Sequence, residues 1–555
     1  MRVPSIARRL PLESLARRVS LGPLGTLDDA AFNLRVLVGA GVVGPQRPDR
    51  LARTLRELAR WGASPAAGIA TSAITDPDSA AVADEAGSLT FADLHRRSNA
   101  LTRGLRDVGV RPGDGVAIMC RNHRGFLEAT LACSKLGTDA LYMNTAFAGP
   151  QLTEVVEREE PVALIYDHEF AELLSEAGQD VWRFVAWTDD DDVADPTLDE
   201  LIASHDGSSL TEVPDESSRF VILTSGTTGT PKGAQRTQPD TLGPLAALFS
   251  RIPLRAREST VIAAPLFHSW GFAHFLLGLA LTSTYVLRRR FDPEETLRAI
   301  ATSRATALVV VPVMMQRILE LPDEVIRRYD VGSLRVTAAS GSALPGELAT
   351  EWMDTFGDNL YNLYGSTEVA WATIATPEDL RAAPGTAGRP PRGTRVRIVD
   401  HDGHDVPPGK TGRVFVGNDM NFEGYTGGGG KDELGGLLSS GDVGHFDAGG
   451  RLFIDGRDDE MIVSGGENVF PREVEDLLAR HEAIVEVAVI GVPDDEFGQR
   501  LKAFVVARED AELTADDVKG HVKANLARFK VPREVEFLDS LPRNATGKVL
   551  KRELA

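Results

Sequence analysis

The fold of this chain depends on the stretch Phe220-Val221-Ile222-Leu223-Thr224-Ser225-Gly226-Thr227-Thr228-Gly229-Thr230-Pro231-Lys232-Gly233. Its first four residues are apolar and have the length of a buried strand. The rest is a loop of glycine, hydroxyl side chains, one proline and one lysine. Glycines let backbone N–H groups approach an anion, hydroxyls donate further hydrogen bonds, and the lysine supplies a cation. The composition predicts a phosphate-binding loop, and the residues around the lysine exclude a Walker loop.

The sequence on both sides of this loop alternates between strand and helix patterns. Apolar runs of strand length are separated by segments with helical periodicity. The predicted strands are 81–83, 115–119, 140–143, 162–166 and 308–311, and the predicted helices are 90–108 and 126–136. Strands separated by helices predict a mainly parallel, doubly wound α/β sheet.

Further motifs follow in order toward the C-terminus. They are Ala338-Ala339-Ser340-Gly341-Ser342-Ala343, Tyr364-Gly365-Ser366-Thr367-Glu368, Ser440-Gly441-Asp442, Gly456-Arg457 and Thr546-Gly547-Lys548. Small residues at a strand end let a flat ring approach the backbone. A tyrosine can stack on a base, and a glutamate can hold Mg²⁺. Each motif alone has an ordinary structural explanation, such as a helix cap or a solvated lysine.

In this order, the motifs resemble those of the acyl-adenylate-forming family, which includes acyl-CoA synthetases, luciferases and the adenylation domains of peptide synthetases. The resemblance covers the chain from about residue 80 to the end. It implies an α/β fold, with a large N-terminal domain of doubly wound mixed sheets plus a distorted barrel. A hinge joins this domain to a small α+β C-terminal domain. The chain then divides into a basic helical extension (1–70), a large adenylation domain (71–455), a hinge (456–460) and a small mobile domain (461–555).

The resemblance also implies site residues for the nucleotide. The phosphates of ATP would bind to Thr224, Ser225, Gly226, Thr227, Thr228, Gly229 and Lys232. Adenine would lie against Gly341, Ser342, Ala343, Tyr364 and Gly365. Asp442 and Arg457 would bind the ribose, and Gly466 would be a further nucleotide contact.

Four residues are implied to be catalytic. Thr367 would donate to the phosphate, and Glu368 would hold Mg²⁺. His268, in a Pro-x-Phe-His segment, would lie near the carboxylate of the acid. Lys548 would bridge that carboxylate and the α-phosphate in the transition state. Asp459 is the implied hinge residue, at which the small domain would rotate between the two half-reactions.

The charge of the chain is unevenly distributed. The net charge of −21 excludes a general nucleic-acid binder, because a phosphate backbone would be repelled. Residues 1–60 nevertheless hold eleven arginines and five acids, a surplus of 11 − 5 = 6. Two interpretations of residues 1–65 stay open. They form an extension docked on the enzyme, or an amphipathic surface that touches an anionic membrane.

Other features predict a cytoplasmic protein. The two cysteines, Cys120 and Cys133, both lie in apolar surroundings, which fits a reducing compartment. The N-terminus lacks the continuous apolar core of a signal peptide. The apolar segment 271–287 is predicted to be a buried helix followed by a strand, and the glycine-rich segments 427–430 and 435–436 are predicted to be disordered.

The predicted function is ATP-dependent activation of a medium- or long-chain fatty acid to an acyl-adenylate with release of pyrophosphate. Transfer to coenzyme A would follow, so the expected cofactors are ATP, Mg²⁺ and coenzyme A. A homodimer is a further expectation. Alternatives are transfer to a carrier protein, activation of an aryl or sterol acid, and a non-catalytic acyl or nucleotide binder. The last is disfavoured, because a lapsed enzyme should have lost some of the charged residues Lys232, Glu368, Asp442, Arg457 and Lys548.

Overall fold

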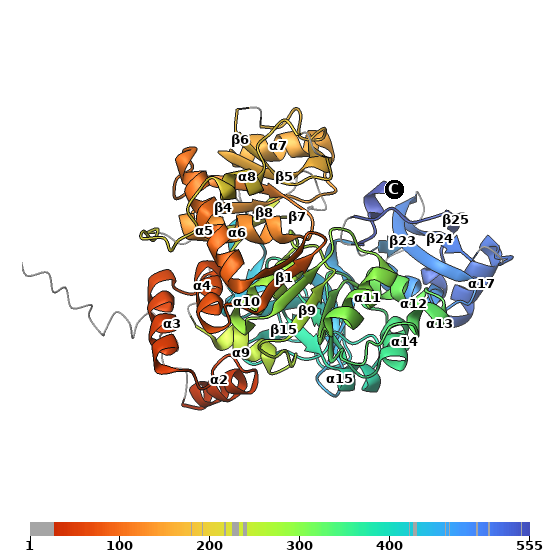
Figure 1. Cartoon of the computed structure of the whole chain (residues 1–555). Coiled ribbons are helices and arrows are strands. Elements are labelled where there is room, and N and C mark those ends of the chain that lie inside the picture. The colour runs from red at the N-terminus through yellow and green to blue at the C-terminus, as the bar shows by residue number, and fades with distance from the viewer. Residues whose placement is uncertain are drawn as a thin grey trace, which may run out of the picture.

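The computed structural model describes residues 27–178, 180–190, 193–215, 218–224, 232–236, 241–420, 422–425, 430–460, 462–464, 467–494, 498–508, 511–544 and 547–554. These residues form four sheets. Three sheets draw their strands from residues before 458, and the fourth draws its strands from residues after 461. The C-terminal part lies beside the larger N-terminal part as a separate lobe (Figure 1).

The first sheet has eight strands in the order β14-β13-β12-β11-β9-β10-β1-β2. Its core is parallel, and the edge strands β2 and β14 are antiparallel to their neighbours. The strands are β1 (Ala80–Asp84), β2 (Gly87–Thr90), β9 (Ser259–Ile262), β10 (Thr284–Leu287), β11 (Ala307–Val310), β12 (Val336–Ala339), β13 (Leu360–Tyr364) and β14 (Thr373–Ala375).

The second sheet has seven strands in the order β17-β8-β7-β4-β3-β5-β6. Its parallel part ends at β7, and β8 and β17 continue it antiparallel. The strands are β3 (Gly115–Met119), β4 (Asp139–Tyr142), β5 (Ala163–Asp167), β6 (Trp182–Trp187), β7 (Phe220–Thr224), β8 (Lys232–Arg236) and β17 (Phe422–Tyr425). The two mixed sheets confirm the predicted doubly wound α/β architecture.

The third sheet is antiparallel and corresponds to the predicted barrel. It contains β15 (Arg395–Val399), β16 (Gly412–Gly417), β18 (Glu433–Leu434), β19 (Leu437–Phe446) and β20 (Leu452–Arg457). The prediction of disorder at 435–436 is wrong, because Gly435 and Gly436 form the turn between β18 and β19. Both have positive φ angles, +57° and +77°, as a tight two-residue hairpin requires. Residues 427–429 lie outside the described residues.

The fourth sheet belongs to the C-terminal lobe. Its strands are β21 (Ile462–Ser464), β22 (Glu467–Val469), β23 (Ile484–Asp494), β24 (Gly498–Ala507) and β25 (Glu534–Phe537). Helices α16 (Pro471–Leu478) and α17 (Ala515–Asn525) pack with these strands around a separate apolar core. The sequence predicts a loop at Pro493 and Asp494, but both residues continue β23 and pair with β24.

The helices of the large domain cover its sheets. They are α4 (Pro65–Thr75), α5 (Phe91–Asp107), α6 (Arg124–Leu136), α7 (Gly149–Glu159), α8 (Leu198–Ala203), α9 (Gly243–Phe249), α10 (Ser269–Leu281), α11 (Pro293–Ser303), α12 (Pro312–Leu319), α13 (Asp323–Ile326), α14 (Gly346–Phe356) and α15 (Pro377–Ala382). Helix α6 is buried from Gly125 to Leu136, because it packs on β1 of the first sheet and on β3 and β4 of the second. It therefore joins the two sheets into one core.

Two further helices precede this core, α2 (Leu27–Gly39) and α3 (Pro48–Trp61). They form an outer layer on the side of the molecule away from the C-terminal lobe (Figure 1). The predicted buried helix and strand in 271–287 are α10 and β10. Among the described residues, none of the helices has both the length and the apolar character needed to cross a membrane.

Candidate active site

The carboxyl edge of the eight-stranded sheet gathers three of the predicted motifs. Strands β9, β11, β12 and β13 are parallel neighbours, so the residues that follow them meet at one edge. His268 comes after β9, Gly341–Ala343 come after β12, and Gly365–Glu368 come after β13. These motifs, separated by up to about a hundred residues in sequence, therefore lie on the same side of the large domain.

Two glycines shape the backbone at this edge. Gly341 has a φ angle of +93°, and a Cβ added there would lie 3.2 Å from Cγ1 of Val311. A Cβ at Gly365 would lie 2.0 Å from the carbonyl oxygen of Ala370, so only glycine fits. Gly341 and Ala343 are exposed. Bare, exposed backbone of this kind suits the face of an aromatic ring.

Tyr364, Asp442 and Arg457 form one polar cluster. Asp442 and Arg457 are opposite each other on β19 and β20. The Tyr364 hydroxyl donates to Oδ2 of Asp442 at 2.5 Å, and Nη1 of Arg457 lies 3.5 Å from Oδ1. Burial raises the pKa of Asp442, while the Tyr364 hydroxyl and the charges of Arg457 and Lys548 oppose that rise. The Asp442 carboxyl group, whose side chain is 13% exposed, therefore lies beside Arg457, and the charge of Lys548 from the C-terminal lobe also lowers its pKa.

Lys548 belongs to the C-terminal lobe, and its side chain is exposed. Its backbone N–H donates to Oδ1 of Asn544 at 2.9 Å, which holds the turn that carries it. The preceding Gly547 has a φ angle of +78° and packs against the large domain. A Cβ at Gly547 would lie 2.3 Å from Cγ1 of Val313 in α12. The turn that bears the lysine thus contacts the large domain, and the lysine charge reaches Asp442.

Glu368 is linked to the strands that flank the hydroxyl-rich loop. The Tyr425 hydroxyl donates to Oε1 of Glu368 at 2.6 Å. Tyr425 lies in β17, where it pairs with Ala234 of β8. Strand β8 in turn pairs with β7, with Thr224 opposite Lys232. The two ends of the loop and the glutamate are therefore parts of one connected arrangement.

The Glu368 carboxylate has the chemistry of a ligand for a hard cation. Burial raises its pKa, but hydrogen bonds from Tyr425 and Ser366 and the charge of Lys431 outweigh this effect, so the pKa lies below its ordinary value. The group is therefore ionised at neutral pH, as an oxygen ligand of Mg²⁺ must be. Thr367 precedes it and is half-buried.

Six residues of the predicted site lie outside the described residues, namely Ser225, Gly226, Thr227, Thr228, Gly229 and Gly466. Thr224 and Lys232 are described only as paired positions of β7 and β8. The hinge residue Asp459 belongs to the short 3₁₀ helix Asp458–Glu460, which follows β20 directly.

His268 follows β9 at the same sheet edge and is the N-cap residue of α10. His268 is half-buried, and burial lowers its pKa to about 4. Burial also lowers the pKa of His274 to about 4. Nδ1 of His268 and Nε2 of His274 have no hydrogen-bond partner among the described residues. Trp270 is fixed differently, because its indole N–H donates to the carbonyl of Val310 at 3.1 Å.

Tyr425 and Val313 are the functional candidates that sequence reasoning missed. Tyr425 lies beside a glycine-rich segment that the sequence marks only as irregular. Val313 looks like an ordinary core residue of α12, and it is half-buried. Their importance depends on pairing between distant strands and on contact between domains, for which the local sequence carries no pattern.

A buried group of potential ligands, Cys120, His123 and Asp167, lies elsewhere in the large domain. The His123 ring donates through Nε2 to Asp167 at 2.7 Å, and its Nδ1 accepts the N–H of Gly125 at 3.1 Å. Both ring nitrogens are thus used within the fold, which indicates a structural role. The exposed group Asp400, Asp402 and His404 belongs to a turn.

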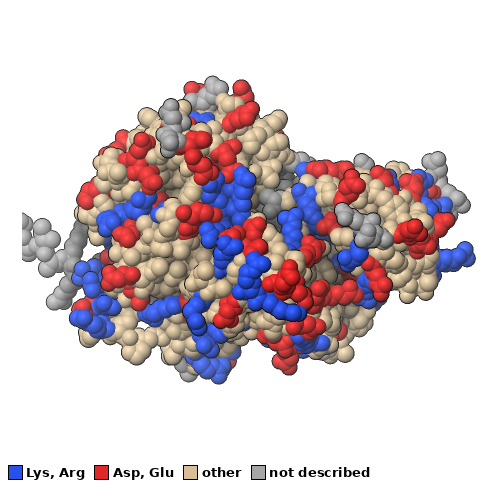
Figure 2. Space-filling view, turned by 45° about the vertical axis from the view of Figure 1, so that its right-hand side comes forward, with Lys and Arg blue, Asp and Glu red and all other residues tan. Residues whose placement is uncertain are grey.

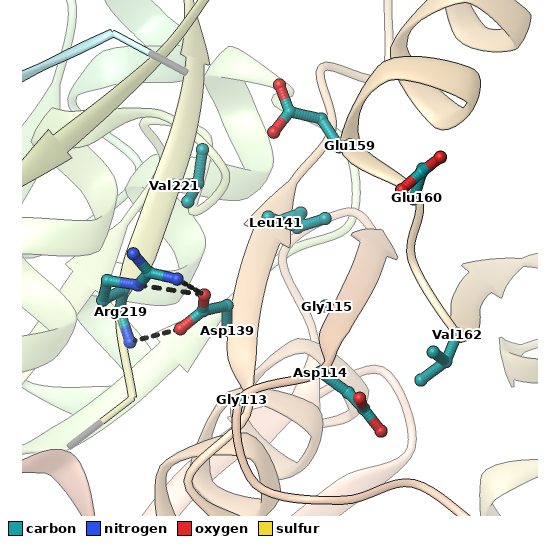
Figure 3. A pocket seen from close by; sticks show the side chains of 10 residues that line it. All are labelled: Gly113, Asp114, Gly115, Asp139, Leu141, Glu159, Glu160, Val162, Arg219 and Val221. Atoms are coloured by element: carbon teal, nitrogen blue, oxygen red, sulfur yellow. Dashed lines mark hydrogen bonds and ion pairs between the residues drawn. The ribbon is translucent and has the colours of Figure 1, made fainter. Parts of the chain in front are cut away.

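A surface cavity of about 300 Å³ lies at the amino ends of β3, β4 and β7 (Figure 3). This edge of the seven-stranded sheet is opposite the hydroxyl-rich loop, which follows the carboxyl end of β7. Asp114, Asp139, Glu159 and Glu160 line the cavity, and its arginine, Arg219, is paired with Asp139 at 2.5 Å. Such a lining repels phosphate and carboxylate groups, so this cavity is not the nucleotide site.

The fold and the clustered motifs define a two-domain enzyme that acts on a nucleotide. A family model described as AMP-binding enzyme matches residues 69–426, and one described as AMP-binding enzyme C-terminal domain matches residues 473–548. The chain therefore belongs to the AMP-binding enzyme family, as an acyl-adenylate-forming ligase of the AMP-forming acyl-CoA ligase type.

Known relatives span nearly the same length. A feruloyl-CoA synthase from Amycolatopsis sp is 34% identical over 487 residues, covering 86% of this chain and 96% of the relative. A fatty acid–[acyl-carrier-protein] ligase from Streptomyces coeruleorubidus is 30% identical over 501 residues, covering 86% and 93%. The solved o-succinylbenzoate CoA synthetase from Bacillus subtilis, in complex with its acyl-adenylate intermediate, has 27% identity and a TM-score of 0.75, covering 88% and 97%.

Proposed function

We propose that this chain activates a hydrophobic carboxylic acid with ATP and passes the acyl group to coenzyme A through the residues of the site described above. The observation that carries the assignment is the cluster around Asp442. Nη1 of Arg457 lies 3.5 Å from the Asp442 carboxylate there, and the turn that carries Lys548 packs on Val313, which follows β11 at the same sheet edge. That arrangement suits a ribose bound between two domains, with its phosphates extending toward Glu368.

The chemistry follows from charge. The carboxylate of the substrate is ionised at neutral pH, because its reference pKa is roughly 4, so the first step requires no general base. What opposes reaction is repulsion between this anion and the α-phosphate, together with the charge that develops on pyrophosphate. Fixed cations and N–H donors reduce both. We assign Lys548 to the bridge between carboxylate and α-phosphate, and Lys232 with the loop 224–229 to the β and γ phosphates.

We assign Mg²⁺ to the carboxylate of Glu368. The ion would neutralise phosphate charge when it is bound with ATP. The chain's own contribution is to keep the carboxylate ionised and oriented, which the 2.6 Å hydrogen bond from Tyr425 does. Thr367 would donate to the phosphate from the same loop.

Two classes of acid remain candidates, and we favour a ring-bearing acid with a polar substituent. His268 and His274 each have a ring nitrogen without a partner among the described residues. An alkyl chain would leave these nitrogens unpaired at a cost, whereas a hydroxyl or carbonyl group could pair with one. Feruloyl and o-succinylbenzoyl groups, named for two relatives, have such substituents. The fatty acid predicted from the sequence remains the second candidate, supported by the apolar side chains of α10 and by the relative named for a fatty acid.

The acceptor is proposed to be coenzyme A, with a carrier-protein phosphopantetheine as the alternative. The acyl-adenylate needs no enzyme nucleophile, because AMP is a good leaving group. The cysteines agree with this, since both are buried and burial raises their pKa values. Pantetheine must reach the acyl-adenylate, so we propose that the small domain turns about residues 456–460 after adenylation.

The acid and the acceptor are tested with one panel. The enzyme is incubated with ATP, Mg²⁺ and single acids, comprising hydroxycinnamates, o-succinylbenzoate and fatty acids of 8 to 16 carbons. Hydroxylamine trapping without coenzyme A measures the adenylate, and thioester formation with coenzyme A or with a carrier protein measures transfer. A fatty acid that reacts at least about tenfold faster than every ring acid would reverse our preference. Absence of adenylate with every acid would support the non-catalytic alternative.

The role of Lys548 is tested by separating the half-reactions. Lys548→Ala should abolish ATP–pyrophosphate exchange and leave transfer from supplied acyl-adenylate to coenzyme A largely intact. Lys523→Ala is the matched control, because Lys523 is an exposed lysine of α17 in the same lobe. Equal loss of both half-reactions in Lys548→Ala would contradict the assignment.

A further inference from the structure

The N-terminal helices carry a concentration of exposed apolar side chains. The described residues include twelve exposed large hydrophobic side chains, and six of them lie between residues 34 and 58. These six are Leu34, Val38, Val43, Leu51, Leu55 and Leu58. Single exposed apolar residues are normal, but a cluster of this kind marks a contact surface.

Three of these residues form a row along α3. Leu51, Leu55 and Leu58 have the spacing i, i+4 and i+7, which places them on one face of the helix. They are 44%, 47% and 40% exposed. We call these three residues the leucine row.

Helix α3 is held to the enzyme through other positions. Trp61 is buried in one apolar cluster with Ala66, Ala67 and Ala70 of α4. The Arg50 side chain donates to the carbonyl of Thr75 at 2.8 Å, and the Arg60 side chain donates to the carbonyl of Leu210. The helix is therefore fixed in place while the leucine row faces solvent.

The charge of this part of the chain is opposite to that of the rest. The described residues 27–60 hold six arginines and four acids, a surplus of 6 − 4 = 2, whereas the whole chain carries −21. Asp28 and Asp29, two of these four acids, are paired with Arg392 of the large domain. Arg53 and Arg56 of α3 are exposed. Figure 2 shows basic and acidic side chains mixed over this face, with several basic ones at its lower left edge.

We propose that α3 docks on the surface of an anionic lipid bilayer, with the leucine row inserted at the headgroup boundary and the arginines contacting lipid phosphates. Leucines on one face and arginines beside them are the composition of an interfacial helix. Long arginine side chains can keep their charge at the headgroups while the helix lies in the interface. Because the body of the enzyme is strongly acidic, an anionic membrane repels it elsewhere and favours contact through this side.

The experiment is flotation of the full-length protein with vesicles. Vesicles of phosphatidylcholine alone are compared with vesicles that contain phosphatidylglycerol at one third. The test variant replaces Leu51, Leu55 and Leu58 by glutamine, which keeps helix propensity. We expect wild type to float with the anionic vesicles, and the variant to bind them at least about tenfold more weakly.

A matched control replaces three exposed apolar residues elsewhere, Leu173, Leu242 and Val485, by glutamine. These side chains are 40%, 48% and 37% exposed. The control should float like wild type. If the leucine row variant is misfolded by circular dichroism, Arg53→Glu with Arg56→Glu replaces it. That pair should abolish binding to anionic vesicles and leave the thermal midpoint within about 2 °C, because both residues are exposed surface charges.

Three outcomes would overturn the proposal. One is equal flotation of wild type and the leucine row variant with anionic vesicles. Another is equal binding of wild type to neutral and anionic vesicles. The third is a dimer by light scattering that dissociates in the leucine row variant, because the row would then be an interface between two copies. Ligase activity without vesicles should be the same in all variants, since none of these residues belongs to the proposed active site.

Discussion

Gly547→Ala tests the contact that brings the C-terminal lysine to the large domain. The added Cβ would lie 2.3 Å from Cγ1 of Val313, and real Cβ contacts stay beyond 3.0 Å, so the turn and Val313 must separate by at least 3.0 − 2.3 = 0.7 Å. The φ angle of +78° adds a conformational cost of about 1–2 kcal/mol for alanine. The strain alone corresponds to a factor of roughly 5 to 30 in rate if it is relieved only when the domains separate.

We therefore expect ATP–pyrophosphate exchange in Gly547→Ala to fall at least about tenfold. Transfer of the acyl group from supplied acyl-adenylate to coenzyme A should stay within about twofold, because we propose that the small domain has turned away for that step. Both half-reactions are measured on the same preparation, and a thermal melt confirms that the variant is folded.

A second substitution separates the contact from the backbone strain. In Gly547→Ala with Val313→Ala, Cγ1 is removed, and the nearest remaining atom is Cβ of residue 313 at 3.2 Å. The alanine at 547 then fits against residue 313, while the conformational cost of its positive φ angle persists. The double variant should therefore recover part of the lost exchange activity. If it is no faster than Gly547→Ala alone, or if Gly547→Ala slows both half-reactions equally, the contact does not belong to the adenylation conformation.

Three further substitutions test the site and its surroundings. Tyr425→Phe removes a donor that keeps Glu368 ionised, so the Mg²⁺ concentration for half-maximal activity should rise about threefold or more at pH 6 and less at pH 8. Tyr364→Phe removes the 2.5 Å hydrogen bond to buried Asp442 and should raise KM for ATP by about tenfold or more. His274, held neutral by burial with a pKa of about 4, stabilises the fold above pH 6.5 and loses that effect as pH falls toward 4. Urea unfolding of wild type should lose about 2 kcal/mol between pH 7 and pH 5 from this group, and His274→Phe should lose correspondingly less.

The sequence predicts this fold well where the signal is local. The strand 115–119 is β3 with the same bounds, and the helix predicted at 90–108 is α5 at Phe91–Asp107. Its start is marked by Thr90 and Asp93, which form a capping box. The prediction of disorder at Gly435 and Gly436 is wrong because glycine is typical both of disordered segments and of tight hairpins. The pairing of β18 with β19 decides between them, and it is visible only in the structure.

The site could be predicted as a set of motifs but not as an arrangement. The order of the motifs identifies Glu368 and Asp442 by the family pattern. Their hydrogen-bond partners, however, depend on the tertiary structure. Tyr425 reaches Glu368 because β17 pairs with β8, a strand about two hundred residues earlier in the chain. No periodicity or composition near Tyr425 encodes that pairing. Local sequence therefore identified the charged groups and left their neutral neighbours unnoticed.

The position of Lys548 has a consequence for release of the nucleotide. Lys548 lowers the pKa of Asp442 from the small domain, whereas Arg457 is the last residue of β20, is paired with Asp442 of β19 and precedes the hinge residue Asp459. If the small domain turns, Asp442 keeps one cation and loses the other, so its already raised pKa should rise further. A protonated carboxyl group accepts a ribose hydrogen bond less well than a carboxylate.

Binding of AMP should therefore weaken as pH falls, and Lys548→Ala should move this loss to higher pH. Calorimetric titration between pH 5 and pH 8 uses adenosine, because the phosphate of AMP itself titrates at about pH 6. The slopes of the two curves are compared because the substitution also changes the affinity itself. Asp442→Asn is the matched control, since it removes the titrating group and should flatten the curve. Parallel curves for wild type and Lys548→Ala would mean that the lysine charge does not reach Asp442 in solution, and the coupling of domain rotation to AMP release would then need another cause.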